Sequence, residues 1–324
     1  MTVRHRTRAR ALVVLGLVMV TLFGTTTAAH AFASAFFPAQ NSGNRGANVT
    51  AIQHLLVQRG ASITVDGAFG PATTSAVASF QRGAGLDDDG IVGPNTWAKL
   101  ITTVRNGSTG PAVKAVQSLL NAKRSSGLTV DGDFGSGTES AVRTFQSHAG
   151  ISSDGVVGPD TWKQLVWHYE YIDFTANLCD QNPDGNGNAN WASSDAVAQL
   201  ETATRGFTGN GKVPVGDSGF EHGGDIPGHA SHEAGMDIDI WPIRTDSAQC
   251  TAGRITWQSS TYDRAATRAL VQAVRAAAPG HIKLVYFNDP VLIGEGLTTS
   301  YDNHDNHLHI RYCEIGHPNS LHAC

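Results

Sequence analysis

The residues best suited to chemistry lie in two short stretches of the C-terminal half. The first stretch runs from His232 to Asp239 around Gly235, and the second, from His304 to His309, contains three histidines. Two histidines and one carboxylate, with a fourth position left open for water, form the ligand set of a catalytic zinc site. The two stretches together can supply such a set.

Both stretches alternate in the way expected of a strand with one buried face. In Met236–Ile240 the apolar residues take one face and the two aspartates take the other. In His307–Tyr312 the leucine, isoleucine and tyrosine take one face, and the histidines and the arginine take the other. Two such strands can bury their apolar faces in one core and turn their polar faces into one cleft. A turn before Gly235 can then fold the His232 imidazole back over Asp239.

These segments resemble the penicillin-insensitive murein endopeptidases, a branch of the zinc peptidases that includes lysostaphin-type enzymes, D-alanyl-D-alanine peptidases and the hedgehog fold. The branch pattern S-H-x-x-G-x-D-x-D-I-W is filled from Ser231 to Trp241, and H-x-x-H-x-H is filled from His304 to His309. The resemblance implies catalytic roles for His307 and His304 beside the metal-bound water. It also implies one zinc ion, Zn2+, with three protein ligands: His232, Asp239 and His309.

Several residues near the candidate zinc ligands could have more than one role. His304, His307 and His229 could each act as a base, donate a hydrogen bond to the transition state or orient another group. Glu233 follows a histidine, but the H-E-x-x-H motif needs a second histidine where this chain has a methionine, so Glu233 is not expected to be the base. Asp237 shares the ligand face and is a candidate to orient a ligand through a hydrogen bond. The other histidines considered are expected to be surface or hydrogen-bonded residues: His54, His148, His168, His281, His317 and His322.

An internal repeat fills the N-terminal half. The motif D-G-x-F-G occurs at residues 66–70 and 131–135, and G-x-V-G-P-x-T-W occurs at residues 90–97 and 155–162. Helical spacing of apolar residues from Val49 onward, with prolines suited to first turns, predicts three short helices in each copy. The repeat resembles the peptidoglycan-binding domain found as an accessory on wall hydrolases. A pair of structural spacers without a ligand is the alternative.

The N-terminus is typical of a secretory signal. Alternate arginines precede an apolar run from Ala11 to Phe23 that is too short to span a bilayer comfortably, and Ala29-His-Ala31 fits a cleavage site. An uncleaved membrane anchor is the alternative. The expected parts are a signal peptide at 1–31, peptidoglycan-binding domains at 41–103 and 105–166, and a zinc metallopeptidase domain at 172–324.

The expected fold class is multidomain, with two small all-α three-helix domains followed by an α+β peptidase domain with a small antiparallel sheet. Within that last domain, Ser193 or Ser194 is expected to cap a helix, and a second helix is expected at 261–278. Residues 282–287 are predicted to form a buried strand. The glycine-rich stretch 206–224 is expected to form loops at the cleft.

Four cysteines lie in the expected peptidase domain, and an even number in an exported chain favours disulfides. Four cysteines allow three pairings, of which we favour Cys179 with Cys250 and Cys313 with Cys324. Zinc ligation by cysteine is the alternative, but the chain has no C-x-x-C pair to support it.

Charge and hydropathy restrict the expected partners. The formal net charge of −5 provides no basic footprint for nucleic acid. No second long apolar run follows the leader, so the mature protein is expected to be free of the membrane, secreted and associated with the cell wall. The expected partner is bacterial peptidoglycan, and a monomer is expected because nothing in the sequence indicates an interface.

The sequence therefore predicts a secreted zinc metallopeptidase that hydrolyses peptide cross-links of peptidoglycan and is targeted to the wall by the repeats. The resemblance implies cleavage between D-alanine and the diamino acid of the neighbouring stem. A zinc D-Ala-D-Ala carboxypeptidase is the enzymatic alternative, although such enzymes usually have alanine where this chain has Asp237. A catalytically inactive wall-binding protein and a phage lysin are further alternatives. Intact candidate ligands argue against the first of these, and the predicted signal peptide argues against the second.

Overall fold

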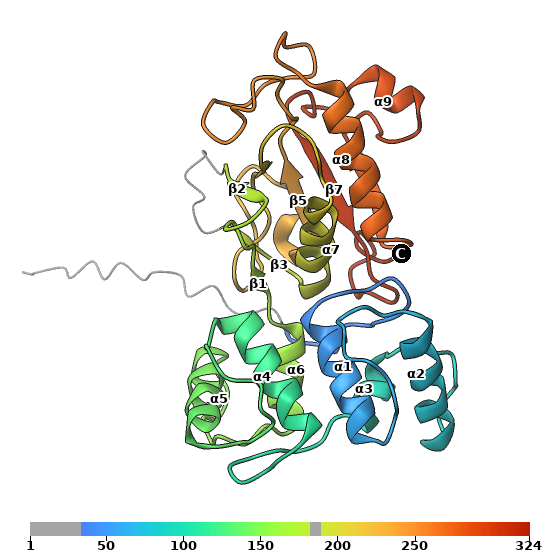
Figure 1. Cartoon of the computed structure of the whole chain (residues 1–324), viewed down its shortest axis with the longest axis vertical. Helices are drawn as coiled ribbons and strands as arrows, with labels where there is room; N and C mark the ends of the chain where they lie inside the picture. The colour runs from blue at the N-terminus through green and yellow to red at the C-terminus, as the bar shows by residue number, and fades with distance from the viewer. Residues whose placement is uncertain (1–33, 182–188) are drawn as a thin grey trace, which may run out of the picture. The chain divides into compact units, whose positions relative to one another are not determined.

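The computed structural model describes residues 34–181 and 189–324 (Figure 1). The predicted signal peptide at 1–31 lies outside the described residues. Among the residues that are described, no helix is both long and apolar enough to cross a membrane. The described residues all belong to one compact unit.

The three short helices predicted for each repeat are confirmed. The first repeat forms α1 (Ala47–Gln58), α2 (Pro71–Gly83) and α3 (Pro94–Leu100). The second repeat forms α4 (Pro111–Arg124), α5 (Ser136–His148) and α6 (Pro159–Trp167). Four of these helices, α2, α3, α4 and α6, have proline in the first turn, where the missing N–H costs no helical hydrogen bond.

The two repeats share one hydrophobic core rather than each closing its own. Helix α1 packs against α4, and the buried apolar residues of both copies form one cluster. The tryptophan of each G-x-V-G-P-x-T-W motif is fully buried in that cluster. The indole N–H of Trp97 donates to the carbonyl of Pro38 at 2.8 Å, and that of Trp162 donates to Thr102 at 2.9 Å. Each tryptophan thus fixes the chain segment that leads into its own repeat.

A buried glutamine holds each turn motif of the repeats. Nε2 of Gln146 donates to Asp154 Oδ1 at 2.8 Å and to the carbonyl of Val156 at 3.0 Å. Its Oε1 accepts from the N–H of Gly155 at 2.8 Å, and that glycine has a φ of 72°, which favours glycine. The arrangement recurs at the other turn motifs through three equivalent residues: Gln53, Gln81 and Gln117.

The C-terminal part is α+β, which confirms the expected fold class. Its main sheet has the strand order β2-β4-β5-β7-β6. The strands are β2 (Leu178–Asp180), β4 (Val213–Val215), β5 (Asp237–Ile240), β6 (Ile282–Tyr286) and β7 (Leu308–Tyr312). A smaller antiparallel sheet pairs β1 (Glu170–Tyr171) with β3 (Trp191–Ala192).

The main sheet is antiparallel except where β2 pairs with β4, which run parallel. The chain between these two strands includes helix α7 (Ser194–Arg205), and parallel neighbours need such a crossover. Ser193 caps α7, and α8 (Arg264–Ala277) forms the second predicted helix. Both helices pack against each other and contribute to the same apolar cluster as the strands (Figure 1). The remaining short elements are η1 (His232–Ala234) and α9 (Pro290–Gly294).

Both favoured disulfides are present. Cys179 in β2 is bonded to Cys250 in the segment after β5, and Cys313, the residue after β7, is bonded to Cys324. The second bond anchors the chain terminus to the strand that carries the histidine motif.

The glutamine network predicts a specific loss of stability. Gln146→Leu should lower the free energy of unfolding by about 1–3 kcal/mol, because the N–H of Gly155 is left buried without an acceptor. Urea denaturation of the full chain measures this loss. The matched control is Ser147→Ala on the exposed side of the same helix, with an expected change within about 0.5 kcal/mol. Equal effects of the two substitutions would contradict the proposed importance of the network.

Candidate metal centre

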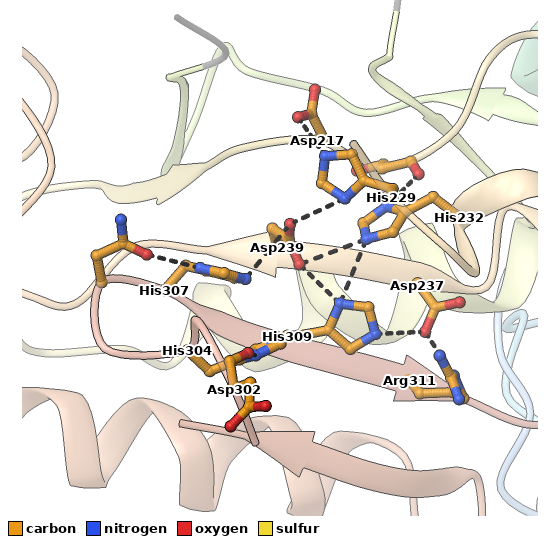
Figure 2. Close-up of polar contacts among 12 residues, drawn as sticks. Asp217, His229, His232, Asp237, Asp239, Asp302, His304, His307, His309 and Arg311 are labelled. Atoms are coloured by element: carbon orange, nitrogen blue, oxygen red, sulfur yellow. Dashed lines mark hydrogen bonds and ion pairs between the residues drawn. The ribbon is translucent and has the colours of Figure 1, made fainter. Parts of the chain in front are cut away.

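The register between β5 and β7 places the two sequence motifs opposite each other. Asp239 pairs directly with His309, and Asp237 pairs with Arg311. The alternate residues, such as Ile238, are fully buried in the apolar cluster below the sheet. The predicted alternation is therefore confirmed, and it brings aspartate and histidine side chains onto one face (Figure 2).

Three of the predicted site residues converge at one point. His309 Nδ1 lies 3.0 Å from Asp239 Oδ1, and His232 Nε2 lies 3.3 Å from His309 Nδ1 and 3.5 Å from Asp239 Oδ1. Ligand atoms at the corners of a tetrahedral zinc site, each about 2.0–2.2 Å from the metal, lie about 3.3–3.6 Å apart. The three atoms already have nearly this spacing, and all three side chains are buried.

The imidazoles of His232 and His309 are each oriented by a hydrogen bond from the ring nitrogen that points away from Asp239. His232 Nδ1–H donates to the carbonyl of Ser218 at 2.6 Å, which leaves Nε2 as the nitrogen that faces Asp239. His309 Nε2–H donates to Asp237 Oδ1 at 2.8 Å, and Arg311 Nε donates to the same oxygen at 2.7 Å. Such outer hydrogen bonds fix the tautomer and ring orientation of metal-binding histidines.

The turn that carries His232 depends on Gly235. The one-turn helix η1 ends at this residue, which has a φ of 60°, and its N–H donates to the carbonyl of His232 at 3.0 Å. A Cβ at position 235 would lie 2.6 Å from the ring of Tyr169. The motif therefore needs glycine for both its backbone conformation and this close approach.

Two further histidines face the second oxygen of Asp239. His229 Nδ1 lies 3.7 Å from Oδ2, and His307 Nε2 lies 3.8 Å from it. His229 Nε2–H donates to Asp217 Oδ2 at 2.8 Å, so His229 is oriented in the same way as the other two imidazoles (Figure 2). His229, His232 and Asp239 also have ligand atoms within 4.8 Å of one another. We favour His309 over His229 as the third ligand because its Nδ1 lies closer to Asp239, at 3.0 Å against 3.7 Å.

The structure places His307 and His304 beside this cluster. His307 Nδ1–H donates to Asn306 Oδ1 at 2.8 Å, so its Nε2 faces Asp239. Burial lowers the pKa of His307 to about 4, which keeps the imidazole neutral at pH 7. The His304 ring centroid lies 4.5 Å from that of His307, and its Nδ1–H donates to the carbonyl of Asp302 at 2.7 Å.

The charges of the cluster suit a cation. Burial opposes the charged form of His309, but hydrogen bonds to Asp237 and Asp239 outweigh burial and raise its pKa to about 9. Burial also opposes ionisation of Asp239, but His232 and His309 hold the pKa of that carboxyl well below its usual value. In the metal-free protein a protonated imidazole therefore occupies the space between two carboxylates.

Sequence reasoning missed Asp217 and Ser218, which orient His229 and His232. They lie in the stretch 206–224 that was expected to form loops at the cleft. This expectation is correct for these two residues, but the stretch also contains strand β4. The available signal was the polar Asp-Ser pair after the short apolar segment Val213–Val215.

The fold and the site together define a class: paired helical modules followed by an α+β domain with a histidine–aspartate centre of metal-binding type. Comparisons with protein families agree with this class. Residues 45–100 and 109–165 match the family described as putative peptidoglycan binding domain, and residues 185–281 match the family described as penicillin-insensitive murein endopeptidase. The chain thus carries two domains of the first family followed by one of the second, which confirms the resemblance.

Individual relatives match smaller parts of the chain. Zinc D-Ala-D-Ala carboxypeptidase of Streptomyces albus G is 34% identical over 100 residues, which is 30% of this chain and 38% of that protein. An uncharacterized protein in the bpoA1 3'region of Kitasatospora aureofaciens is 49% identical over 57 residues, 17% of this chain and 48% of its own length. The matched part of the chain therefore spans less than half the length of each of these curated relatives.

Among solved structures, the fused Zn-dependent amidase/peptidase/peptidoglycan-binding domain-containing protein of Clostridium acetobutylicum ATCC 824 is 33% identical. The match covers 28% of this chain and 39% of that one, with a TM-score of 0.20, which is too low to support a conclusion about the fold. The murein endopeptidase match ends at residue 281, before the second motif. The pairing of β5 with β7 is therefore what links His309 to the matched part of the chain.

The outer hydrogen bonds predict an effect on metal affinity. Asp237→Asn should weaken zinc binding by about 10–100-fold, because it removes the negative charge that orients and polarises the His309 imidazole. Competition with a chromophoric chelator measures the dissociation constant. The matched control, Asp246→Asn, changes an exposed carboxylate paired with Arg244 and should leave affinity unchanged. Equal affinities of the two variants would contradict the role assigned to Asp237.

The raised pKa of His309 predicts that zinc uptake depends on pH. Zinc binding must displace the proton of His309, so affinity should fall by about tenfold for each pH unit below about 9 and level off above it. The same competition assay between pH 7 and 10 tests this expectation. A flat profile between pH 7 and 9 would show that His309 carries no proton to displace.

Proposed function

We propose that this chain is an exported zinc metallopeptidase that hydrolyses peptide cross-links of bacterial peptidoglycan. The observation that carries the proposal is the spacing of His232 Nε2, Asp239 Oδ1 and His309 Nδ1, which lie 3.0–3.5 Å apart. This set lies in a domain whose first motif falls within the murein endopeptidase match. Two preceding domains of a peptidoglycan-binding family supply the means of reaching such a substrate.

The donor set fits zinc. Two imidazole nitrogens and one carboxylate oxygen face a common point, and both imidazoles have their other nitrogen engaged by an oxygen acceptor. We assign His232, Asp239 and His309 as the ligands. A zinc ion in such a site acts as a Lewis acid on the substrate carbonyl and lowers the pKa of its bound water from 15.7 toward about 7.

The protein supplies proton transfer through His307 and His304. His307 is neutral at pH 7 and can accept a proton at Nε2 while its Nδ1–H remains bonded to Asn306. The negative charge of Asp239, whose Oδ2 lies 3.8 Å away, stabilises the imidazolium that results. His304 adjoins His307 and is placed to orient it or to pass the proton toward the leaving amine.

His229 is assigned a different task. Its bond to Asp217 raises its pKa, so it remains a hydrogen-bond donor at a higher pH than His307. It adjoins His232, with its ring centroid 4.2 Å from that of His232. This placement suits a donor that stabilises the negative charge developing on the substrate oxygen.

The repeats and the predicted signal peptide complete the proposal. Two weak binding modules in one chain raise affinity for a polymeric wall through effective concentration. Secretion follows from the predicted signal at 1–31, and the resemblance implies the bond between D-alanine and the diamino acid of the neighbouring stem.

A zinc D-Ala-D-Ala carboxypeptidase is the second candidate, because a relative of that name is 34% identical over 100 residues. Asp237 favours the endopeptidase, since the resemblance implies alanine at this position in most such carboxypeptidases. Digestion of purified cross-linked peptidoglycan, with products identified by mass spectrometry, separates the two. Conversion of dimers to monomers supports the endopeptidase, whereas loss of terminal D-alanine from intact dimers supports the carboxypeptidase. No release by the zinc-loaded protein would refute both.

Substitutions of His307 and His309 distinguish the proposed base from a proposed zinc ligand. His307→Ala should lower kcat by about 10²–10⁴-fold while the zinc content stays at the wild-type level, because it removes proton transfer alone. His309→Ala should lower both activity and zinc content. The zinc content of each purified variant is measured alongside its digestion activity, with His54→Ala in the first repeat as the control. Loss of zinc from His307→Ala would show that His307 is a ligand rather than the base.

A further inference from the structure

A second group of histidines lies away from the candidate metal centre. His148 ends helix α5 of the second repeat, His168 follows helix α6, and His222 lies between β4 and η1 of the peptidase domain. The three ring centroids are 4.9–5.7 Å apart. One nitrogen from each ring lies within 4.8 Å of the other two.

One carboxylate faces all three rings. Glu221 Oε1 lies 3.0 Å from His148 Nε2 and 3.9 Å from His168 Nε2, and its Oε2 lies 3.8 Å from His222 Nε2. Arg124 Nη1 also contacts Glu221 Oε1, so the carboxylate is held from the α4 side. The position of this carboxylate amid three imidazole nitrogens is that of a fourth ligand.

The protonation states of these groups suit a metal ion. Burial lowers the pKa of His168 to about 4 and, together with the charge of Arg124, lowers the pKa of His148. Burial opposes ionisation of Glu221, but its hydrogen bond to His168 and the charge of Arg124 lower its pKa to about 2. At pH 7 His148 and His168 are therefore neutral and Glu221 is ionised, and neutral imidazole and carboxylate are donors that zinc and similar dications prefer.

We propose that His148, His168, His222 and Glu221 form a second zinc site, which cross-links the second repeat to the peptidase domain. Binding requires the nitrogens to close from within 4.8 Å to about 3.3 Å of one another. The side chain of His168 is fully buried, whereas those of His148 and His222 are 25% and 21% exposed, so the proposal requires these two to move. The ligands come from three segments far apart in the sequence, so the ion would restrict motion between the two domains.

The charge of Arg124 opposes a dication at this site. Without an ion, the same contacts describe an Arg124–Glu221 ion pair with three histidines packed around it. The zinc site and the metal-free ion pair differ in the number of zinc ions bound, because the zinc site holds one more ion per chain.

The test counts zinc in the full chain after equilibrium dialysis, using inductively coupled plasma mass spectrometry. We expect two zinc ions per chain in the wild type and one in His148→Ala/His222→Ala. The variant His309→Ala, which removes a ligand of the first site, should retain one ion. The control His54→Ala removes a histidine outside both clusters and should retain two.

One zinc ion in the wild type that is retained in His309→Ala would mean that the first site is empty and would support this one. No zinc in His309→Ala would overturn the proposal. So would two ions in the doubly substituted variant. The His309→Ala count keeps the test decisive if the double variant does not fold, because it leaves all four residues of the second site intact. Digestion activity enters none of these counts, so failure of this site and failure of the proposed function remain distinguishable.

Discussion

The candidate site depends on the register between two antiparallel strands. Pairing of β5 with β7 sets Asp239 opposite His309 and Asp237 opposite Arg311. A shift of one residue would turn both histidine and aspartate into the apolar core, because successive strand residues face opposite sides. Burial of Ile238 and Ile310 on the core face therefore fixes the position of the polar side chains on the other face.

Each imidazole of the centre is positioned by an acceptor outside the cluster. Ser218, Asp237 and Asp217 accept hydrogen bonds from His232, His309 and His229, respectively. These acceptors select which nitrogen faces Asp239, and buried polar groups of this kind are stable only when they are bonded. The carboxylates also leave the metal-free cluster with a proton on His309 that a cation must displace.

Short sequence patterns predicted the features of this molecule that depend on residues close together in the sequence. The repeat helices and the alternation in β5 and β7 follow from spacing and turn residues. Cysteine number indicated disulfides but allowed three pairings, and the favoured one is present. The parallel pair β2–β4, the roles of Asp217 and Ser218 and the core shared by the two repeats depend on segments that meet only in the folded chain. His148 and His168 were assigned no function because neither has a ligand-like neighbour in sequence.

The most direct test of the central claim is a crystal structure of the zinc-loaded full chain with anomalous data at the zinc edge. We predict a peak about 2.0–2.2 Å from His232 Nε2, Asp239 and His309 Nδ1, with His309 Nε2 still bonded to Asp237. A peak ligated by His229, His232 and Asp239, with His309 remaining hydrogen-bonded to Asp239, would contradict the assigned ligand set.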